Sequence, residues 1–174
     1  TLFIDHEKRL DLHMRALWEE DAHLVPYSRG VDLLRKPRPY YTADGMRIPD
    51  SYDPLNEVSG MNRYRAVLGH MSAHRRWGQA IVADNFSPFQ RHTAEMLEDS
   101  RVEYLLMQRY PGLRRLFLAL HPSPVEGSCD HENESCIRHR TAMLSRAILD
   151  PNHDYQSEVI NDFARSEERR IGKE

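Results

Sequence analysis

The sequence lacks any apolar stretch long enough to cross a bilayer, and it contains only 2 cysteines. A membrane-spanning helix needs about 20 consecutive apolar residues, so we expect no membrane insertion. Two cysteines are too few to form a disulfide scaffold for 174 residues, and such scarcity favours a reducing compartment. The cytoplasm is therefore the expected location.

An excess of positive charge and a cluster of glycines are also missing. Lys and Arg number 24 against 27 Asp and Glu, giving a net charge of −3, whereas non-specific binding to nucleic acid relies on surplus basic residues. The 8 glycines are not grouped as in a phosphate-binding loop, and no Gly-x-Ser-x-Gly nucleophile motif occurs. We therefore expect neither a nucleic-acid partner nor P-loop or α/β-hydrolase chemistry.

Both ends of the sequence suggest a fragment. The N-terminus has no initiator Met and carries charged residues where a signal peptide needs its apolar region. The last residues, 167–174, are mostly charged and suggest a cut before further sequence. No internal repeat or shift in composition marks a second domain. We expect residues 1–174 to be a single helical domain from a longer chain, with residues 37–60 as a hairpin and loop insertion.

Apolar residues recur every three to four positions through most of the chain, which predicts α-helices. Ser87 followed by Pro88 combines an N-cap with proline in the first helical turn. Asn62 is the N-cap candidate of the preceding helix. Predicted helices cover residues 4–24, 62–77, 87–109, 113–120 and 134–149, with a last helix from about residue 153.

Proline and glycine interrupt the helical pattern between the first two of these helices. Within residues 40–49, Asp44 and Gly45 form the turn signal of a small β-hairpin. Residues 30–36 fit either a short helical turn or a strand. The predicted fold class is therefore mainly α, a helical bundle with one small β-hairpin.

Two histidines one helical turn apart form the candidate site. His70 and His74 stand at i and i+4, so both point from one face of their predicted helix. Neutral imidazole and carboxylate oxygen are zinc ligands. Glu98 is the expected third ligand, because Glu95, Glu98 and Val102 fall on one line of the next long helix. The predicted metal site is thus His70, His74 and Glu98, with zinc as its ion and no other cofactor indicated.

The base of the helical zinc-hydrolase motif is absent from this pair. In that motif Glu directly follows the first histidine and activates the bound water, but Met71 occupies this position here. A hydrolase would need an unconventional base. In a reading without metal, the histidines are satisfied core residues and ion pairs hold two packed helices in register. The base candidates are Glu95, Glu98 and Glu103, and the ion pairs would join Arg65, Arg75, Arg76 and Arg101 to Glu95, Glu98, Asp99 and Glu103.

A second cluster contains both cysteines. Cys129, His131, Cys136 and His139 could close a tetrahedral structural site, but their spacing matches no standard zinc module. The favoured interpretation is a helix-capping loop with a half-buried cysteine. A disulfide remains open, although a cytoplasmic setting argues against it.

Several blocks of the sequence resemble the region that precedes the von Willebrand A domain in NorD/CbbO-type proteins. These blocks are residues 62–77, 98–103, 109–116 and 135–140, and the resemblance covers roughly residues 40 to 150. Members of this family work with a hexameric MoxR-class AAA+ ATPase to activate a client enzyme, either Rubisco or nitric oxide reductase. The Asp-x-Ser-x-Ser adhesion motif of their A domain is absent from these 174 residues, so its client-binding role cannot be assigned to any position here.

The resemblance implies a chaperone-like adaptor rather than an enzyme. Such a fragment would act by protein–protein binding, docking to the ATPase ring, positioning the A domain, or both. His70, His74 and Glu98 would then form a degenerate zincin-like core that either keeps a structural metal or replaces it with hydrogen bonds. The alternative function is a zinc-dependent hydrolase that uses His70 and His74 with a carboxylate.

Overall fold

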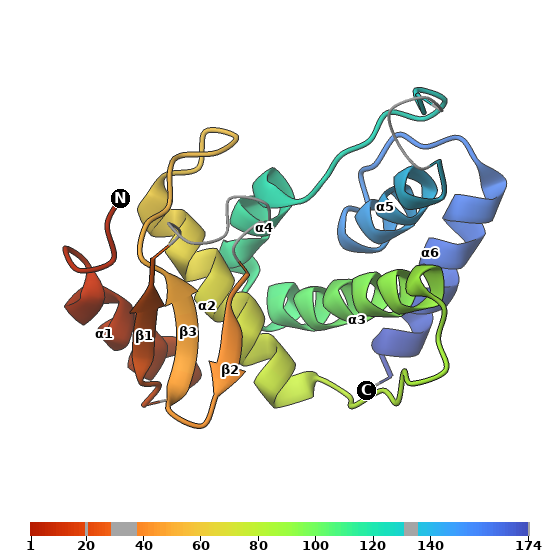
Figure 1. Cartoon of the computed structure of the whole chain (residues 1–174). Coiled ribbons are helices and arrows are strands. Elements are labelled where there is room, and N and C mark those ends of the chain that lie inside the picture. The colour runs from red at the N-terminus through yellow and green to blue at the C-terminus, as the bar shows by residue number, and fades with distance from the viewer. Residues whose placement is uncertain (20, 29–37, 131–135, 174) are drawn as a thin grey trace. The chain divides into compact units, whose positions relative to one another are not determined.

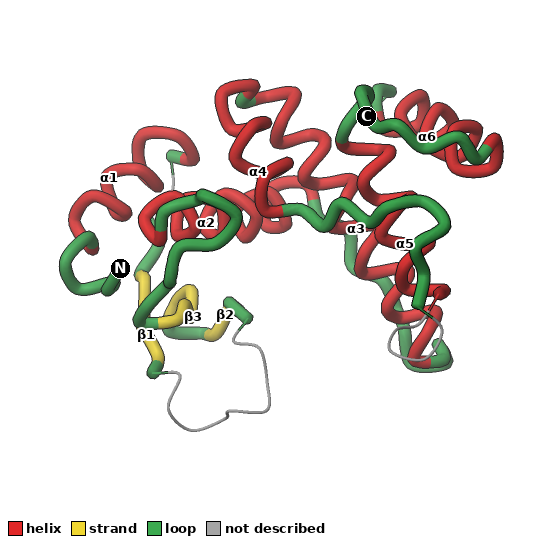
Figure 2. Tube along the Cα trace, turned by 90° about the horizontal axis from the view of Figure 1, so that it is seen from above, coloured by secondary structure: helices red, strands yellow, loops and turns green. Residues whose placement is uncertain are grey.

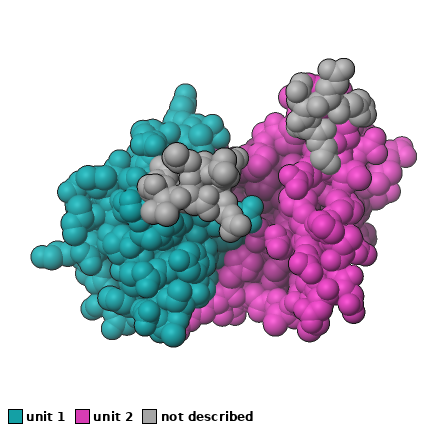
Figure 3. Space-filling view, in the orientation of Figure 1, with its two compact units in different colours: residues 1–72 teal, residues 73–174 magenta. Residues whose placement is uncertain are grey.

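The computed structural model describes residues 1–19, 21–28, 38–130 and 136–173. The chain divides into two compact units, Thr1–Ser72 and Ala73–Glu174, which Figure 3 colours separately. The division falls inside α2 (Gly60–Trp77), which is one unbroken helix. Each unit has buried apolar side chains of its own.

The first unit combines helices with a small mixed sheet (Figure 1). Helix α1 (Glu7–Trp18) is followed by β1 (Leu24–Tyr27), β2 (Tyr40–Thr42) and β3 (Gly45–Pro49). Strand β3 is central, antiparallel to β2 and parallel to β1. The predicted hairpin is confirmed, whereas β1 was not predicted. The predicted helix of residues 4–24 was too long, because the helix ends at Trp18.

Buried side chains tie the elements of this unit together. Helix α1 buries Leu10, Met14 and Trp18, spaced four residues apart on one face. The Tyr64 side chain on α2 is fully buried, and its hydroxyl donates to the Pro49 carbonyl oxygen at 3.0 Å. This bond joins α2 to the end of the central strand. It also supplies a donor to a buried carbonyl, a group that is seldom left without one.

Two glycines of the first unit occupy crowded positions. Gly45 has a φ of 137°, which side chains rarely tolerate, and a Cβ there would collide with the carbonyl oxygen of His23. At Gly60 a Cβ would collide with the carbonyl oxygen of Tyr52. The sheet and the start of α2 therefore each need a residue without a side chain, Gly45 and Gly60 respectively.

The second unit is helical. It contains α3 (Pro88–Arg109), the 3₁₀ turn η2 (Pro111–Leu113), α4 (Arg114–Leu120), α5 (Cys136–Leu149) and α6 (Glu158–Ile171). Helix α3 lies alongside α5, which packs against α6 (Figures 1 and 2). A core cluster forms around the last two helices, from Met143, Ala147, Tyr155, Ile160 and Ala164.

The helix starts follow the local sequence signals to different degrees. Ser87 and Gln90 form a reciprocal capping box, with Pro88 in the first turn, so the predicted start of α3 is confirmed. Helix α2 begins at Gly60, two residues before the predicted N-cap. The last helix begins at Glu158, later than predicted. The prediction for residues 30–36 falls outside the described residues.

The predicted fold class is confirmed at its coarse level, since the chain is mainly helical with a small sheet. The sheet has three strands rather than a hairpin alone, because β1 adds to the free edge of β3. Within the described part of the chain, no helix combines the length and the apolar character that crossing a bilayer would require.

Candidate metal centre

The two candidate histidines lie one helical turn apart on α2, His70 in the first unit and His74 in the second. Asp99 lies on α3 and belongs to the second unit, like His74. The structure brings this carboxylate of α3 to His74, and the zinc site stays a prediction.

His74 and Asp99 are in direct contact. The Nε2 atom of His74 lies 2.9 Å from Oδ1 of Asp99. Their side chains keep 29% and 50% of their surface exposed, so the pair is reachable from solvent. The His74 imidazole thus shares a hydrogen bond with a carboxylate of α3.

Glu98, the predicted third ligand, is held by Arg101 and by the backbone of Gln79 instead. Its two carboxylate oxygens accept hydrogen bonds from Nε of Arg101 at 2.8 Å and from Nη2 of Arg101 at 2.9 Å. The backbone N–H of Gln79 donates to the same carboxylate at 2.9 Å. A bidentate guanidinium contact of this kind is strong and directional. The carboxylate beside His74 is that of the next residue, Asp99.

The contacts of Glu98 also change its acidity. Burial by itself raises the pKa of this carboxyl group, but the hydrogen bonds from Arg101 and Gln79 and the charge of Arg101 outweigh burial and lower the pKa. The carboxylate stays charged and paired. It is therefore a poor proton acceptor and a poor candidate for the base of a hydrolase.

Arg101 also links α3 to the end of α2. Its side chain is buried, and Nη2 donates to the backbone carbonyl oxygen of Trp77, the last residue of α2. The C-terminal carbonyls of a helix have no partner within the helix, so the guanidinium caps one of them. The ion pair of Arg101 with Glu98 lies within α3, three residues apart. Within the second unit, the Trp77 carbonyl bond and the His74–Asp99 bond both reach from α3 to the C-terminal part of α2.

A cleft of about 550 Å³ opens beside these contacts in the second unit. His74 and Asp99 lie at its wall, together with the acidic side chains Asp84 and Glu95 and the basic side chain Arg91. His74 and Asp99 are therefore adjacent to a space that small molecules or a partner's side chain can enter.

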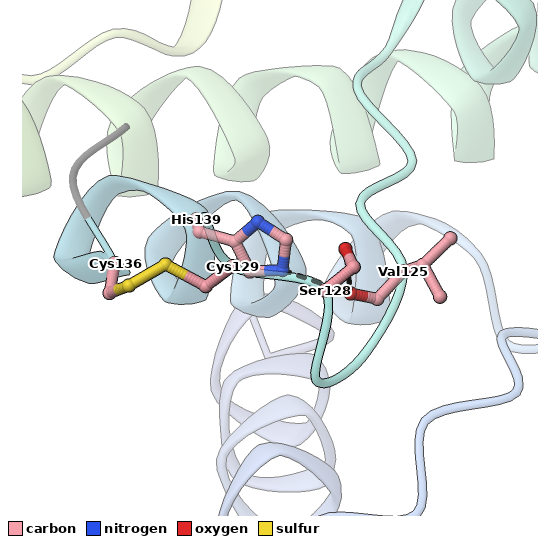
Figure 4. Close-up of a disulfide and its surroundings, with 5 residues drawn as sticks. All are labelled: Val125, Ser128, Cys129, Cys136 and His139. Atoms are coloured by element: carbon pink, nitrogen blue, oxygen red, sulfur yellow. Dashed lines mark hydrogen bonds between the residues drawn. A yellow bond between two sulfur atoms is a disulfide. The ribbon is translucent and has the colours of Figure 1, made fainter. Parts of the chain in front are cut away.

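The second predicted cluster is a disulfide (Figure 4). Cys129 and Cys136 are bonded, with their Cα atoms 5.6 Å apart, which corrects the favoured interpretation of unpaired cysteines. Cys136 is the first residue of α5. Disulfide sulfurs are not thiolate ligands, and Nε2 of His139 donates to the Val125 carbonyl oxygen at 3.0 Å. His131 lies outside the described residues.

One polar chain in the second unit was missed at the level of sequence. Nε2 of His121 lies 2.8 Å from Oγ of Ser145, which in turn lies 2.6 Å from Oγ of Ser100. Nδ1 of His121 donates to the Pro122 carbonyl oxygen at 2.8 Å. Both serines are buried, so this Ser–His contact is a structural link between helices and not an accessible nucleophile. No local motif marks it, because its members are 21 or more residues apart, apart from Pro122.

Burial sets the protonation of His121. Desolvation lowers its pKa, and this effect outweighs the opposing influence of Glu103 and of the Pro122 carbonyl. The imidazole is therefore held neutral in the folded unit.

Comparisons with known proteins identify no relative. No protein-family model matches the chain, and no significant match was found to a curated protein or to a solved structure. Function is therefore inferred from contacts within the second unit and from the residue blocks that resemble NorD/CbbO-type proteins.

Proposed function

We propose that this chain is a non-enzymatic adaptor that acts by protein–protein binding in an ATPase-driven enzyme-activation machine. Its partners would be a hexameric MoxR-class AAA+ ATPase and a client enzyme, either Rubisco or nitric oxide reductase. The resemblance of four sequence blocks to NorD/CbbO-type proteins supports these partners. A partner that consumes ATP would place the chain in the cytoplasm.

One observation carries the non-enzymatic part of the proposal: Glu98, the carboxylate expected from the sequence to serve as ligand or base, is already bound. Glu98 accepts two hydrogen bonds from Arg101 and one from the Gln79 N–H. Met71 occupies the position where a helical zinc hydrolase carries its glutamate. Helices α2 and α3 would then be a degenerate zincin-like core whose polar groups hold the fold rather than activate water.

An adaptor needs an accessible surface, and the second unit exposes apolar side chains next to the cleft. Ile81 lines the cleft, and Val82, the next residue, keeps 81% of its surface exposed. Phe89, in the first turn of α3, is also exposed. Exposed apolar groups beside charged ones are typical of binding surfaces. We assign this segment to partner docking.

The test is binding of the purified chain to a hexameric MoxR-class ATPase, measured by analytical ultracentrifugation together with ATP hydrolysis. We expect a complex that Val82→Asp weakens at least tenfold, because a buried charge in an interface is costly. Val159→Asp is the matched control, since Val159 is 77% exposed on α6 and lies outside this segment. Absence of binding to the ATPase and to both client enzymes would refute the adaptor function.

A zinc-dependent hydrolase is the second candidate, and the cleft favours it. Glu95 lines the same cleft as His74 and Asp99 and has an exposed side chain, so it could serve as the base in place of Glu98. Peptidase activity that requires zinc and disappears in Glu95→Gln would establish this function. Activity that is absent with zinc bound would eliminate it.

A further inference from the structure

We propose that the Cys129–Cys136 disulfide is a redox switch within the second unit. When it is oxidised, residues 124–129 are held against α5 and against the start of α6. When it is reduced, this segment separates from α6 and uncovers apolar side chains. The switch goes beyond the proposed adaptor function, because it requires neither an ATPase nor a client enzyme.

The Glu126 carboxylate lies at the N-terminus of α6. It accepts hydrogen bonds from the backbone N–H of Gln156 at 2.6 Å and of Ser157 at 3.1 Å. Ser157 is the N-cap residue, and its own side chain makes no capping hydrogen bond with the described residues. A negative charge at this end of a helix is stabilised by the helix dipole. The start of α6 is therefore held by a side chain from an earlier loop.

Two more hydrogen bonds hold the carbonyl groups just before Glu126. The Tyr155 hydroxyl donates to the Pro124 carbonyl oxygen at 2.9 Å. On the other side, Nε2 of His139 on α5 donates to the Val125 carbonyl oxygen at 3.0 Å (Figure 4). Each such bond contributes little net stability, because water competes for the same groups. The position of residues 124–126 therefore depends on how the rest of the segment is held.

The disulfide holds the other end of the segment. Cys129 is bonded to Cys136, the first residue of α5. This covalent link restricts the conformations open to residues 124–129 and so lowers the entropic cost of forming the hydrogen bonds around Glu126. Gly127 lies between the two attachments, and among the described residues no atom lies within 4 Å of the place that its Cβ would occupy. The middle of the segment thus adds little packing of its own.

A reductant can reach the disulfide. Both cysteines are half-buried and line a pocket of about 630 Å³. A thiolate of a dithiol such as dithiothreitol attacks Cys129 Sγ and displaces Cys136 as a thiolate, which the N-terminus of α5 stabilises. The second thiol then closes the cyclic disulfide of the reagent and releases Cys129. The reagent is oxidised by two electrons, and its two protons end on the two cysteines.

The same pocket gives the reduction a structural consequence. Met143 and Ile160 line it together with Glu126 and Cys129. These two apolar side chains are only 3% and 7% exposed, respectively. When Glu126 and Cys129 move away, the pocket loses part of its wall. Reduction therefore uncovers apolar surface between α5 and α6.

The experiment compares amide hydrogen exchange in the full chain, oxidised and treated with dithiothreitol. We expect the N–H groups of Gln156 and Ser157 to exchange at least about tenfold faster after reduction, because they lose their acceptor. The N–H of Gln90, which is bound to Ser87 in the capping box of α3, should change by less than about twofold. The fluorescence of anilinonaphthalene sulfonate, a dye that binds apolar surface, should rise on reduction.

Two variants separate the disulfide from the carboxylate. Cys136→Ser should exchange like the reduced chain and should not respond to dithiothreitol. Glu126→Ala keeps the disulfide but removes the acceptor, so Gln156 and Ser157 should exchange faster even in the oxidised chain. Circular dichroism checks that both variants fold.

Several results would overturn the proposal. One is equal exchange at Gln156 and Ser157 in the oxidised and reduced chains, or dye fluorescence that reduction leaves unchanged. Another is an equal acceleration at Gln90, since the effect would then be a general loss of stability. Failure of the two cysteines to form the bond under air oxidation, read by mass after alkylation, would also overturn it. None of these results bears on ATPase binding, so the adaptor function is tested separately.

Discussion

Replacing Arg101 by methionine is the most direct test of how the second unit is held together. Methionine keeps the length and the apolar stem of the side chain but removes the guanidinium. Glu98, whose side chain is only 13% exposed, would lose its charge partner. The Trp77 carbonyl oxygen would lose its donor at the same time. The Glu98 carboxylate would then lack the guanidinium, and the Trp77 carbonyl oxygen would lack the hydrogen bond from Arg101.

The magnitude follows from these two losses. Removing one partner of a buried ion pair costs about 3 kcal/mol or more, because an unpaired charge remains. The Gln79 N–H still donates to Glu98, so we take the lower end, about 3 kcal/mol. For a chain of this size this corresponds to a fall in melting temperature of about 6–12 °C. In the double variant Arg101→Met with Glu98→Met no charge is stranded, and we expect at least about 2 kcal/mol less destabilisation than the sum of the single variants.

The assay is urea unfolding monitored by circular dichroism, supported by calorimetry. The matched control is Arg165→Met, which removes an i,i+3 pair with Asp162 whose side chains are 68% and 74% exposed. This change should cost less than about 0.5 kcal/mol, because exposed pairs contribute little. The reasoning is refuted if both arginine variants are destabilised equally, or if the effects at Arg101 and Glu98 simply add.

Three further predictions concern other parts of the chain. The His121 pKa is lowered by burial, so the stability that its neutral form contributes should be complete above about pH 6.5 and decrease as the pH falls below that value. Denaturant titrations at several pH values should show that the free energy of unfolding depends less on pH in His121→Gln than in the unmodified chain. Reduction of the Cys129–Cys136 bond should lower the free energy of unfolding by about 2 kcal/mol, and Cys136→Ser should abolish that response to dithiothreitol. Tyr64→Phe removes the buried donor of the Pro49 carbonyl and should cost about 1–3 kcal/mol in thermal unfolding, whereas a loss below 0.5 kcal/mol, about the effect of an exposed substitution, would contradict the role of that bond.

The parts of the fold that were predicted are those set by neighbouring residues. The start of α3 follows from Ser87, Pro88 and Gln90, which cap their own helix. The turn between β2 and β3 follows from Asp44 and Gly45. Strand β1 was missed because it pairs with residues 22 positions further along the chain, as in Leu24 with Met46. A strand of four residues that contains a proline carries too weak a local signal to reveal such a partner.

The candidate site was predicted in part for a similar reason. The spacing of His70 and His74 is a property of one helix and could be read directly. The choice between Glu98 and Asp99 depends on how α3 is rotated about its axis, since adjacent residues point about 100° apart. That rotation is set by contacts of Ser100 and Arg101 with other segments, which no local pattern records.

The prediction of unpaired cysteines was wrong because it relied on the expected cellular compartment and not on the spacing of the two cysteines. Cys129 and Cys136 are close enough in sequence to pair, but a low cysteine count suggested a reducing environment. Disulfides persist mainly in oxidising surroundings, so the bond is at odds with the cytoplasmic location expected for a partner of the proposed ATPase. The redox state of these cysteines in cells therefore bears directly on the proposed partnership.

Gly45 and Gly60 limit how far this protein can diverge. Each lies where a backbone carbonyl, of His23 for Gly45 and of Tyr52 for Gly60, occupies the space of a side chain, so no compensating change at a neighbouring side chain can relieve a substitution. Drift can replace surface charges and much of the apolar core, because cores tolerate volume-conserving exchange. A descendant that keeps the first unit must still keep both glycines. Their fixed separation ahead of a long helix thus provides a marker of ancestry that can outlast recognisable overall similarity.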